Sequence, residues 1–267
     1  MSNAVIDSTD FAADWQQWHD QHEEARADKH GFLAVTGLHY LTDEPQRFER
    51  APGQWWTDDA GIHVTLAAGE ILDYDGQPRS DEQVDFGIIP ERGGVTAGFE
   101  DGVIEIAKRG GQDIIRPRHP DHEILTAYEG TPTFAPDPSW VLEGRYTAYA
   151  EPIPTTVGAA VDDLQHVYDA PGEIHFSKDG QDLTLVAFPG HGDNLLVLLR
   201  DATSGVSTYA ANRALSVPAP DADGRVTLDF NRATNLPCAY TPYATCPLPP
   251  AQNRLPIAVE AGEKTPL

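Results

Sequence analysis

The sequence predicts an all-β protein, mainly an antiparallel sandwich or barrel, with one N-terminal α-helix. After Gly31, short apolar or alternating runs are broken about every 8–12 residues by Gly, Pro, Asp or Asn, a rhythm that is typical of antiparallel β folds. Apolar residues recur at helical spacing only near the N-terminus. No glycine-rich phosphate loop, nucleophile elbow or zinc-binding helix motif occurs.

The length and composition predict a globular protein. The 267 residues can bury most of their apolar surface without disulfides, and 40% hydrophobic residues argue against a disordered chain. No apolar run approaches a membrane span. Residues 1–14 lack the basic and apolar regions of a signal peptide, so a cytoplasmic location is expected.

The charge balance is strongly acidic. There are 42 acidic and 18 basic residues, a net charge of −24, and only four lysines. Such a surface repels nucleic acid and anionic membranes, and it resembles the halophilic type, in which salt screens the self-repulsion. A cationic partner is the alternative. The halophilic interpretation predicts a lower melting temperature in dilute buffer than in molar salt, and an unchanged melting temperature would contradict it.

The N-terminal segment predicts an amphipathic helix over residues 10–29. Phe11, Trp15, Trp18, His22 and Ala25 recur at helical spacing. Ser8 and Thr9 offer N-cap side chains, and a glycine follows His30 where a C-cap is expected. Packing of the two tryptophans on the body of the protein is favoured over ligand stacking.

The rest of the chain predicts two β regions, residues 31–138 and 139–267, after a helical segment at residues 1–30. The regions are either separate or one continuous domain. In the first, strands are expected at Phe32–Thr36, Gly61–Leu66, Glu70–Tyr74, Val84–Ile89, Gly94–Phe99, Val103–Lys108 and Gln112–Arg116. In the second, they are expected at Tyr146–Glu151, Ile153–Val157, His166–Tyr168, Gly172–Ser177, Gln181–Phe188, Asn194–Arg200, Ser207–Tyr209, Ala214–Val217 and Arg225–Asn231. The proline-rich residues 117–140 connect the two regions.

Residues 201–264 carry a dense set of short motifs. They include Asp201–Tyr209, Asp229–Ala233, Pro237–Ala239, Tyr243–Pro250, Asn253–Pro256 and Ala261–Lys264. Together these motifs resemble the C-terminal signature of an uncharacterised family, domain of unknown function 1684. Gly37–Leu41, Arg109 and Ile115–Arg118 resemble weaker patterns of the same family. The resemblance implies a mostly β protein with a short N-terminal helix, and it implies no activity, substrate or cofactor.

The proline-rich segment, residues 226–256, contains the first candidate site residues. If residues 225–232 form a strand, Asp229 and Asn231 share one face, where they could orient a substrate or a water molecule as catalytic candidates. They could equally satisfy backbone groups of the segment itself. The structural role is favoured, and the segment is then a rigid strap that closes one end of the β body.

The arginines support a second set of alternatives. Arg116, Arg118, Arg213, Arg232 and Arg254 lie in or near the motifs. If several converge on one cleft, they make an anion site, because the guanidinium group fits carboxylate or phosphate. The competing interpretation, which is slightly favoured, is a set of structural ion pairs such as Arg232 or Arg213 with Asp229.

Other candidates are weaker. His119, Asp121 and His122, joined by His191, could offer metal ligands, but a solvated loop is favoured and no metal site is predicted. Ser204 and Thr208 fit a turn better than a nucleophile. Cys238 lacks a histidine nearby in the sequence that could activate it. With Cys246 it is expected to be a buried free thiol, and a disulfide between the two is the alternative.

The leading functional hypothesis is a β protein that binds a small molecule. One version of this hypothesis has an anion as the ligand, and no cofactor is predicted. The predicted ligand site comprises Arg116, Tyr209, Arg213, Asp229, Asn231, Arg232, Tyr240 and Arg254. One alternative is a hydrolase for a small anionic substrate, with Asp229 or a histidine as base. The other is a structural or interaction module without a pocket. The oligomeric state stays open.

Overall fold

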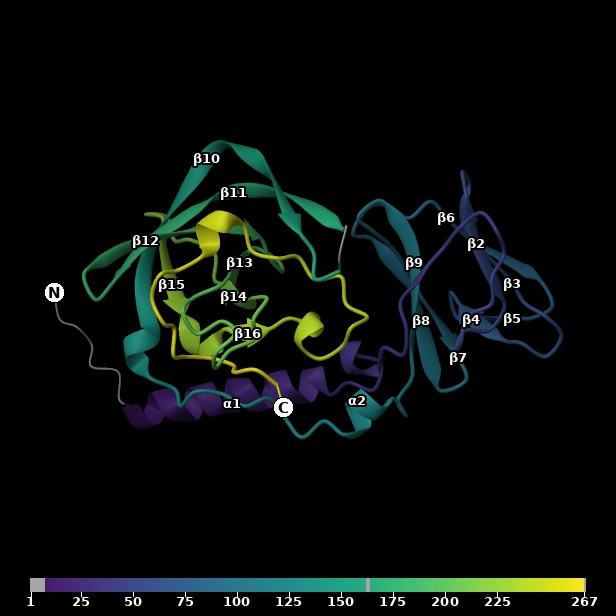
Figure 1. Cartoon of the computed structure of the whole chain (residues 1–267), viewed down its shortest axis with the longest axis horizontal. Helices are drawn as coiled ribbons and strands as arrows, with labels where there is room; N and C mark the ends of the chain where they lie inside the picture. Colours follow the sequence, from purple (N-terminus) through teal and green to yellow (C-terminus); the bar gives the residue numbers. More distant parts are fainter. Residues whose placement is uncertain (1–7, 162–163, 267) are drawn as a thin grey trace. The chain divides into compact units, whose positions relative to one another are not determined.

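The computed structural model describes residues 8–161 and 164–266 (Figure 1). The chain folds into two compact units. Unit 1 consists of the N-terminal residues up to Glu24, Glu129–Tyr240 and Cys246–Leu267, whereas unit 2 consists of Ala25–Tyr128 and Thr241–Thr245. Every pairing between two of the strands described is antiparallel. The predicted all-β class with one N-terminal helix is therefore confirmed.

Helix α1 spans Ser8–Arg26, three residues shorter at its C-terminal end than expected. Asp28 ends it, because its carboxylate accepts a hydrogen bond from the His30 N–H at 2.7 Å and its carbonyl accepts one from Gly31. Trp15 is buried in unit 1, where its Nε1 donates to the Asn231 carbonyl at 2.8 Å. The expected N-cap side chains, those of Ser8 and Thr9, lie outside the described part of the chain.

Unit 2 contains a six-stranded and a three-stranded sheet. The first has the order β1-β9-β8-β7-β4-β5 and the second β2-β3-β6. The strands are β1 (His39–Tyr40), β2 (Gln54–Asp58), β3 (Gly61–Thr65), β4 (Leu72–Tyr74), β5 (Gln77–Arg79), β6 (Gln83–Gly87), β7 (Gly94–Phe99), β8 (Gly102–Arg109) and β9 (Gln112–Arg118). Trp55, Ile62, Leu72, Ile104 and Ile106, all fully buried, belong to one core that both sheets share.

Short helices complete unit 2. They are the 3₁₀ helix η1 (Phe32–Ala34) and helix α2 (Glu123–Thr126). Residues Phe32–Thr36 were predicted to be a strand, and this prediction is wrong. Leu33 and Ala34 are both buried in this tight turn. The apolar run therefore indicated buried residues correctly, but burial alone does not distinguish a strand from a 3₁₀ turn.

Unit 1 is built on a seven-stranded sheet of order β15-β10-β11-β12-β13-β14-β16. The strands are β10 (Val141–Gly158), β11 (Gln165–Lys178), β12 (Gln181–Pro189), β13 (Leu195–Leu199), β14 (Arg213–Val217), β15 (Arg225–Asp229) and β16 (Thr234–Asn235). Figure 1 shows β10 and β11 as a long curved ribbon. Four residues of β13 are buried, and its continuous apolar run is typical of a strand that is covered on both faces.

The core of unit 1 lies on one face of this sheet. It contains Ile174 on β11, Leu185 on β12, Val197 on β13, Leu215 on β14 and Leu228 on β15. Alternate residues of β14 and β15 point to the opposite face, where Trp18 and His22 of α1 line a cavity together with Ala214 and Thr227. This face carries the site described below.

The proline-rich segment has little regular structure. It continues from β15 into the 3₁₀ helices η3 (Phe230–Arg232), η4 (Pro237–Ala239) and η5 (Ala251–Asn253). The strand predicted to reach Asn231 ends at Asp229, because the Asp229 carboxylate accepts a hydrogen bond from the Asn231 N–H and caps η3. The connection at 117–140 contains α2 and the 3₁₀ helix η2 (Pro138–Trp140). In the predicted strand Ser207–Tyr209, Thr208 forms an isolated bridge with Ser204.

Candidate functional site

A cavity of about 540 Å³ in unit 1 lies beside α1, on the face of the sheet away from the core. Ala214 on β14 and Thr227 on β15 form part of its floor, while their neighbours Leu215 and Leu228 fill the core. Strand alternation therefore separates cavity from core. Trp18, one helical turn after the anchored Trp15, supplies part of the wall.

Asp229 and Arg232 stand together at this cavity. Arg232 Nε lies 3.1 Å from Asp229 Oδ2 as an ion pair, and Arg232 Nη2 donates to Asp14 Oδ2 at 2.6 Å. The guanidinium carbon lies 5.3 Å from the centre of the Trp18 ring, within the range of a cation–π contact. The predicted pair between Arg232 and Asp229 is thus present, and it faces the cavity.

His22 completes the polar part of the cavity. Its ring stacks on Trp18 with centroids 5.3 Å apart and 14° between the planes. Its Nε2 lies 3.5 Å from Glu263 Oε1. Sequence reasoning did not include Trp18 and His22 in the site, because they precede Arg232 by more than 200 residues. Their i, i+4 spacing on the helix was the available signal.

Asn231 has a structural role. Its side chain is buried, and it accepts a hydrogen bond from the Asp137 N–H at 2.8 Å and donates to the Asp137 carbonyl at 3.0 Å. Its Nδ2 also donates to Asp229 Oδ1 at 2.9 Å. Asn231 therefore satisfies the backbone of the 117–140 connection, instead of that of the segment that follows it.

Arg213 is also structural. It is 1% exposed, and its Nη2 donates to Asp201 Oδ2 at 2.9 Å and to the Val259 carbonyl at 3.0 Å. Its Nη1 donates to the carbonyls of Ala261 and Glu263. Arg213 thus forms a structural ion pair with an aspartate, as one of the two alternatives predicted. Its partner is Asp201, and not Asp229.

Four other predicted ligand residues are placed elsewhere. The Tyr209 hydroxyl donates to the Cys238 carbonyl at 2.7 Å, and burial, with Cys238 nearby, raises the pKa of Tyr209 to about 12. The Tyr240 hydroxyl lies 2.8 Å from Thr131 Oγ1. Arg254 is exposed and outside the cavity lining. Arg116 lies in unit 2. Of the eight residues, Asp229 and Arg232 line the unit 1 cavity.

The two cysteines are free thiols. The Cys238 N–H donates to Cys246 Sγ at 3.3 Å. The hydrogen bond between the thiols lowers the pKa of Cys238, although burial opposes this, and Tyr209 contributes to the decrease. The pair is a local contact within unit 1.

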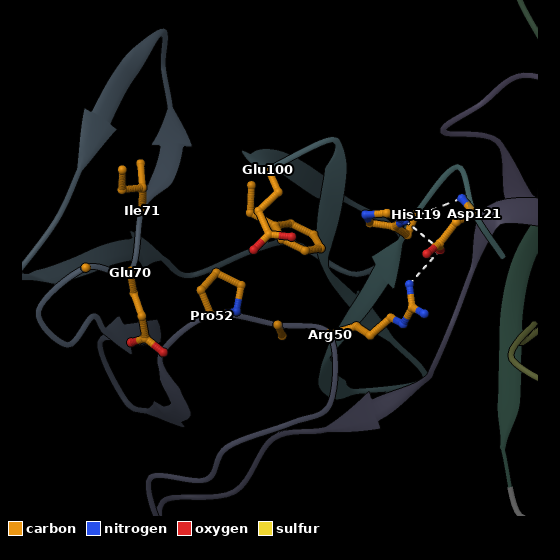
Figure 2. A pocket seen from close by; sticks show the side chains of 10 residues that line it. Arg50, Pro52, Glu70, Ile71, Glu100, His119 and Asp121 are labelled. Carbon is orange, nitrogen blue, oxygen red and sulfur yellow. Dashed lines mark hydrogen bonds and ion pairs between the residues drawn. The ribbon is translucent and has the colours of Figure 1, made fainter.

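A second cavity, of about 690 Å³, lies in unit 2 (Figure 2). Its lining includes His119 and Asp121, two of the residues that the sequence offered as metal ligands, and Arg50. Asp121 Oδ1 is 2.6 Å from both Arg50 Nη1 and His119 Nδ1. The hydrogen bond from Arg50 lowers the pKa of Asp121, and His119 adds to this, while burial opposes it.

No membrane-spanning helix and no metal cluster appear in residues 8–161 and 164–266. None of their helices has the length and apolar character that a membrane crossing requires. No three or more of their His, Cys, Asp and Glu side chains are grouped so that they could hold a metal ion.

The C-terminal half of the chain matches a known protein family. Residues 126–264, just over half of the chain, match the family described as "Protein of unknown function (DUF1684)". The chain belongs to this family. The DUF1684 match takes in the strands of unit 1, with Asp229 and Arg232, whereas the unit 2 cavity residues from Arg50 to Asp121 precede it.

One solved structure that is similar to this member of DUF1684 is the solution NMR structure of an uncharacterized protein of Haloarcula marismortui. It shares 35% sequence identity, and the similarity covers 52% of this chain and 78% of that chain, with a TM-score of 0.44. No curated protein matches the sequence.

Proposed function

We propose that this protein binds a small molecule in the cavity of unit 1. The observation that carries the proposal is that Asp229 and Arg232, two polar residues of the proline-rich segment, line a cavity of about 540 Å³. The volume is typical of small-molecule sites. Asn231, Tyr209 and Arg213 hold the surrounding backbone, so they support the site without lining it.

The charges at the cavity favour a neutral polar or zwitterionic ligand over a simple anion. Arg232 directs Nη2 to Asp14 and Nε to Asp229, so its positive charge is balanced. Nη1 can donate to an acceptor on the ligand. Together with the net charge of −24, these carboxylates oppose an incoming anion.

The remaining surface suits an apolar group on the same ligand. Trp18, Leu196, Ala214 and Pro218 line the cavity and offer hydrocarbon or aromatic contacts. Both oxygens of Asp229 are already engaged, Oδ1 with Asn231 and Oδ2 with Arg232. This arrangement supports a role for Asp229 in holding Arg232, and it favours binding over the alternative in which Asp229 is a catalytic base.

The test uses three probes of similar shape and different charge: benzamide, benzoate and benzylammonium. Binding is followed by NMR through the Trp18 indole signal, which is assigned with Trp18→Phe. We expect benzamide to shift this signal with a Kd on the order of millimolar, since a fragment gains only a fraction of a kcal/mol per atom. Benzoate should bind more weakly because of Asp14 and Asp229.

The matched control compares Arg232→Ala with Arg225→Ala. Arg225 lies at the start of β15, outside the cavity lining. Its side chain is 70% exposed and pairs with Asp223. Benzamide binding should be lost in the first variant and kept in the second. If benzoate binds more strongly than benzamide, the hypothesis of an anionic ligand holds instead. If none of the three probes binds, the result supports a structural module without a ligand.

A further inference from the structure

His119 occupies a position at the end of a strand where the backbone fixes its ring. It follows β9 directly, and its N–H donates to the Ala34 carbonyl at 2.9 Å. The His119 carbonyl accepts a hydrogen bond from the His122 N–H at 3.1 Å, which closes a turn. Pro120 sits inside this turn, and Asp121 returns its carboxylate to the His119 ring.

The hydrogen bonds of the carboxylate determine how the imidazole is presented. His119 Nδ1 has two neighbours, Asp121 Oδ1 at 2.6 Å and the Asp121 N–H at 3.4 Å. A carboxylate only accepts hydrogen bonds, so the much shorter contact with Oδ1 assigns a proton to His119 Nδ1. In the neutral ring, Nε2 then carries the lone pair. Figure 2 shows the second ring nitrogen of His119 on the side of Glu100, away from Asp121. The side chain of His119 is 17% exposed.

Arg50 completes the arrangement. Its Nη1 donates to the same Asp121 oxygen at 2.6 Å, which keeps the carboxylate ionised and in place. Arg50 lines the cavity, and a guanidinium has further N–H groups besides the one bonded to Asp121. A base, a carboxylate that orients it and a cation for a developing oxyanion are therefore gathered in one cavity.

We propose that the unit 2 cavity is an acid–base site that hydrolyses esters of small, positively charged alcohols. His119 Nε2 takes a proton from water while the water oxygen forms a bond to the ester carbonyl carbon. The carbonyl oxygen, now negative, is stabilised by Arg50. When the bond between that carbon and the alcohol oxygen breaks, His119 returns the proton to the leaving oxygen. The products are a carboxylic acid and an alcohol, and one water molecule is consumed.

The charge preference comes from Glu100. In the described residues Glu100 has no ion-pair partner, and its carboxylate faces the cavity across from His119 in Figure 2. The other carboxylates at the cavity are balanced: Glu70 by Arg47 at 2.6 Å and Asp121 by Arg50. One uncompensated negative charge therefore remains for a cationic group, and the acidic surface raises the local concentration of cations.

This activity is independent of the binding proposed for unit 1, because the residues differ. The probes are acetylcholine and its neutral counterpart 3,3-dimethylbutyl acetate, and the readout is acetate release by NMR. We expect His119→Gln to lower the rate above buffer by about 100-fold or more, as loss of a general acid–base group does. His191→Gln, which alters an exposed histidine of unit 1, should retain the full rate.

Two further variants separate catalysis from structure. Glu100 is exposed. Glu100→Gln should raise the KM for acetylcholine several-fold and leave its kcat unchanged, while the KM for the neutral ester stays the same. Asp121→Asn should lower kcat for both esters with KM unchanged, because the imidazole loses the carboxylate that holds its tautomer. Besides Asp121, the charged groups that line the cavity with His119 are Arg50, Glu70 and Glu100.

The proposal is overturned if wild type and His119→Gln release acetate equally fast. It is also overturned if Asp121→Asn leaves kcat unchanged, because His119 then acts without the carboxylate that orients it. The substrate class is wrong if the neutral ester is hydrolysed as efficiently as acetylcholine. If His119→Gln does not fold, the KM effect of the surface variant Glu100→Gln decides.

Discussion

In unit 1 a single arginine, Arg213, is surrounded by acceptors, whereas in unit 2 a single carboxylate, Glu105, receives three arginines. Arg213 contacts Asp201 and the carbonyls of Val259, Ala261 and Glu263, and both members of its ion pair have side chains that are at most 1% exposed. The Glu105 side chain is 12% exposed.

The Glu105 cluster follows from strand register. Glu105 on β8 lies directly opposite Arg116 on β9, and Arg118 is two residues further along the same face. Arg116 Nη2 donates to Oε1 at 2.6 Å, Arg109 Nη2 donates to the same oxygen at 2.9 Å, and Arg118 donates to Oε2. Arg116 was predicted as a ligand residue, and its guanidinium is directed to Glu105.

The two ion-pair sites differ in the number of partners and in access to solvent. Loss of Arg213 leaves a carboxylate without its cation in a place that water does not reach. Loss of one arginine at Glu105 leaves two others, and the remaining charges are partly hydrated. Since an unpaired buried charge costs far more than an exposed one, the loss of one arginine that pairs with a carboxylate should have very different effects in the two units.

Arg213→Met is expected to have the largest effect. It keeps the hydrophobic stem but leaves Asp201 unpaired and removes donors from three carbonyls, so the free energy of unfolding should fall by about 3–5 kcal/mol. Urea denaturation followed by circular dichroism measures the change. The double variant Arg213→Met with Asp201→Asn should recover part of the loss, because no buried charge remains.

A ligand-binding role for Arg213 makes the opposite prediction. If Arg213→Met unfolds at the same urea concentration as wild type, the side chain is not part of the core, and the structural assignment fails. The control is Arg254→Met, which alters an exposed arginine of the same unit and should change the free energy of unfolding little.

The fold was predictable where the local pattern and the tertiary context agree. The hairpin of β7 and β8 turns at Glu100 and Asp101, as the alternation on both sides of Glu100–Gly102 indicates. Two predicted strands, Tyr146–Glu151 and Ile153–Val157, are instead parts of β10. The two predicted strands leave out Pro152, where the structure continues as one strand with a register shift between Ala148 and Ile153. A bulge tolerates the missing N–H of Pro152.

The candidate site was predictable only in part, for a different reason. Asp229 and Arg232 stand out because they are polar residues in an apolar, proline-rich segment, and their pairing follows from i, i+3 proximity. Trp18 and His22 reach the same cavity only through the docking of α1, which includes the hydrogen bond from Trp15 to the Asn231 carbonyl. That contact spans 216 residues, and no local pattern encodes it.

Glu105→Gln is expected to have an intermediate effect. Glutamine keeps one acceptor oxygen but no charge, so three partly exposed arginines lose their anion and the free energy of unfolding should fall by about 2 kcal/mol. Burial raises the pKa of Glu105, but Arg116 and Arg118 outweigh it and lower the pKa. This contribution is therefore complete above the unfolded pKa and is lost as the pH falls through the folded pKa.

The pH dependence provides the measurement for Glu105. The difference in urea midpoint between wild type and Glu105→Gln should be constant near neutral pH and shrink toward zero in acid. The control is Glu173→Gln, which alters a carboxylate of unit 1 that pairs with the half-exposed His175. A difference that grows as the pH falls would contradict the assigned role of the arginines.

Arg116→Met tests redundancy directly and should have a smaller effect. Glu105 retains Arg109 and Arg118, so the free energy of unfolding should fall by about 1 kcal/mol or less. The comparison with Arg213→Met in urea is the critical result, because both variants remove one arginine that bonds a carboxylate. Equal losses would show that the partial exposure and shared partners of Arg116 do not matter.

His63 of unit 2 should produce the smallest effect, a pH dependence near neutrality. Its Nδ1 lies 2.6 Å from Asp85 Oδ1 and its Nε2 lies 3.0 Å from Asp58 Oδ1. Burial lowers the pKa of His63, but the hydrogen bonds to Asp85 and Asp58 outweigh it and raise the pKa above 6.5. The contribution of His63 is therefore complete below the unfolded pKa and is lost as the pH rises through the folded pKa.

The measurement is the urea midpoint between pH 5.5 and 8.5 for wild type and His63→Gln. The stability advantage of wild type should decrease with rising pH across this range, where the two carboxylates stay ionised. Burial lowers the pKa of His39 and of His122 in the same unit, and their contributions have the opposite sign, but both variants contain them and the difference cancels them. An advantage that increases with pH would mean that burial, and not the two carboxylates, dominates at His63.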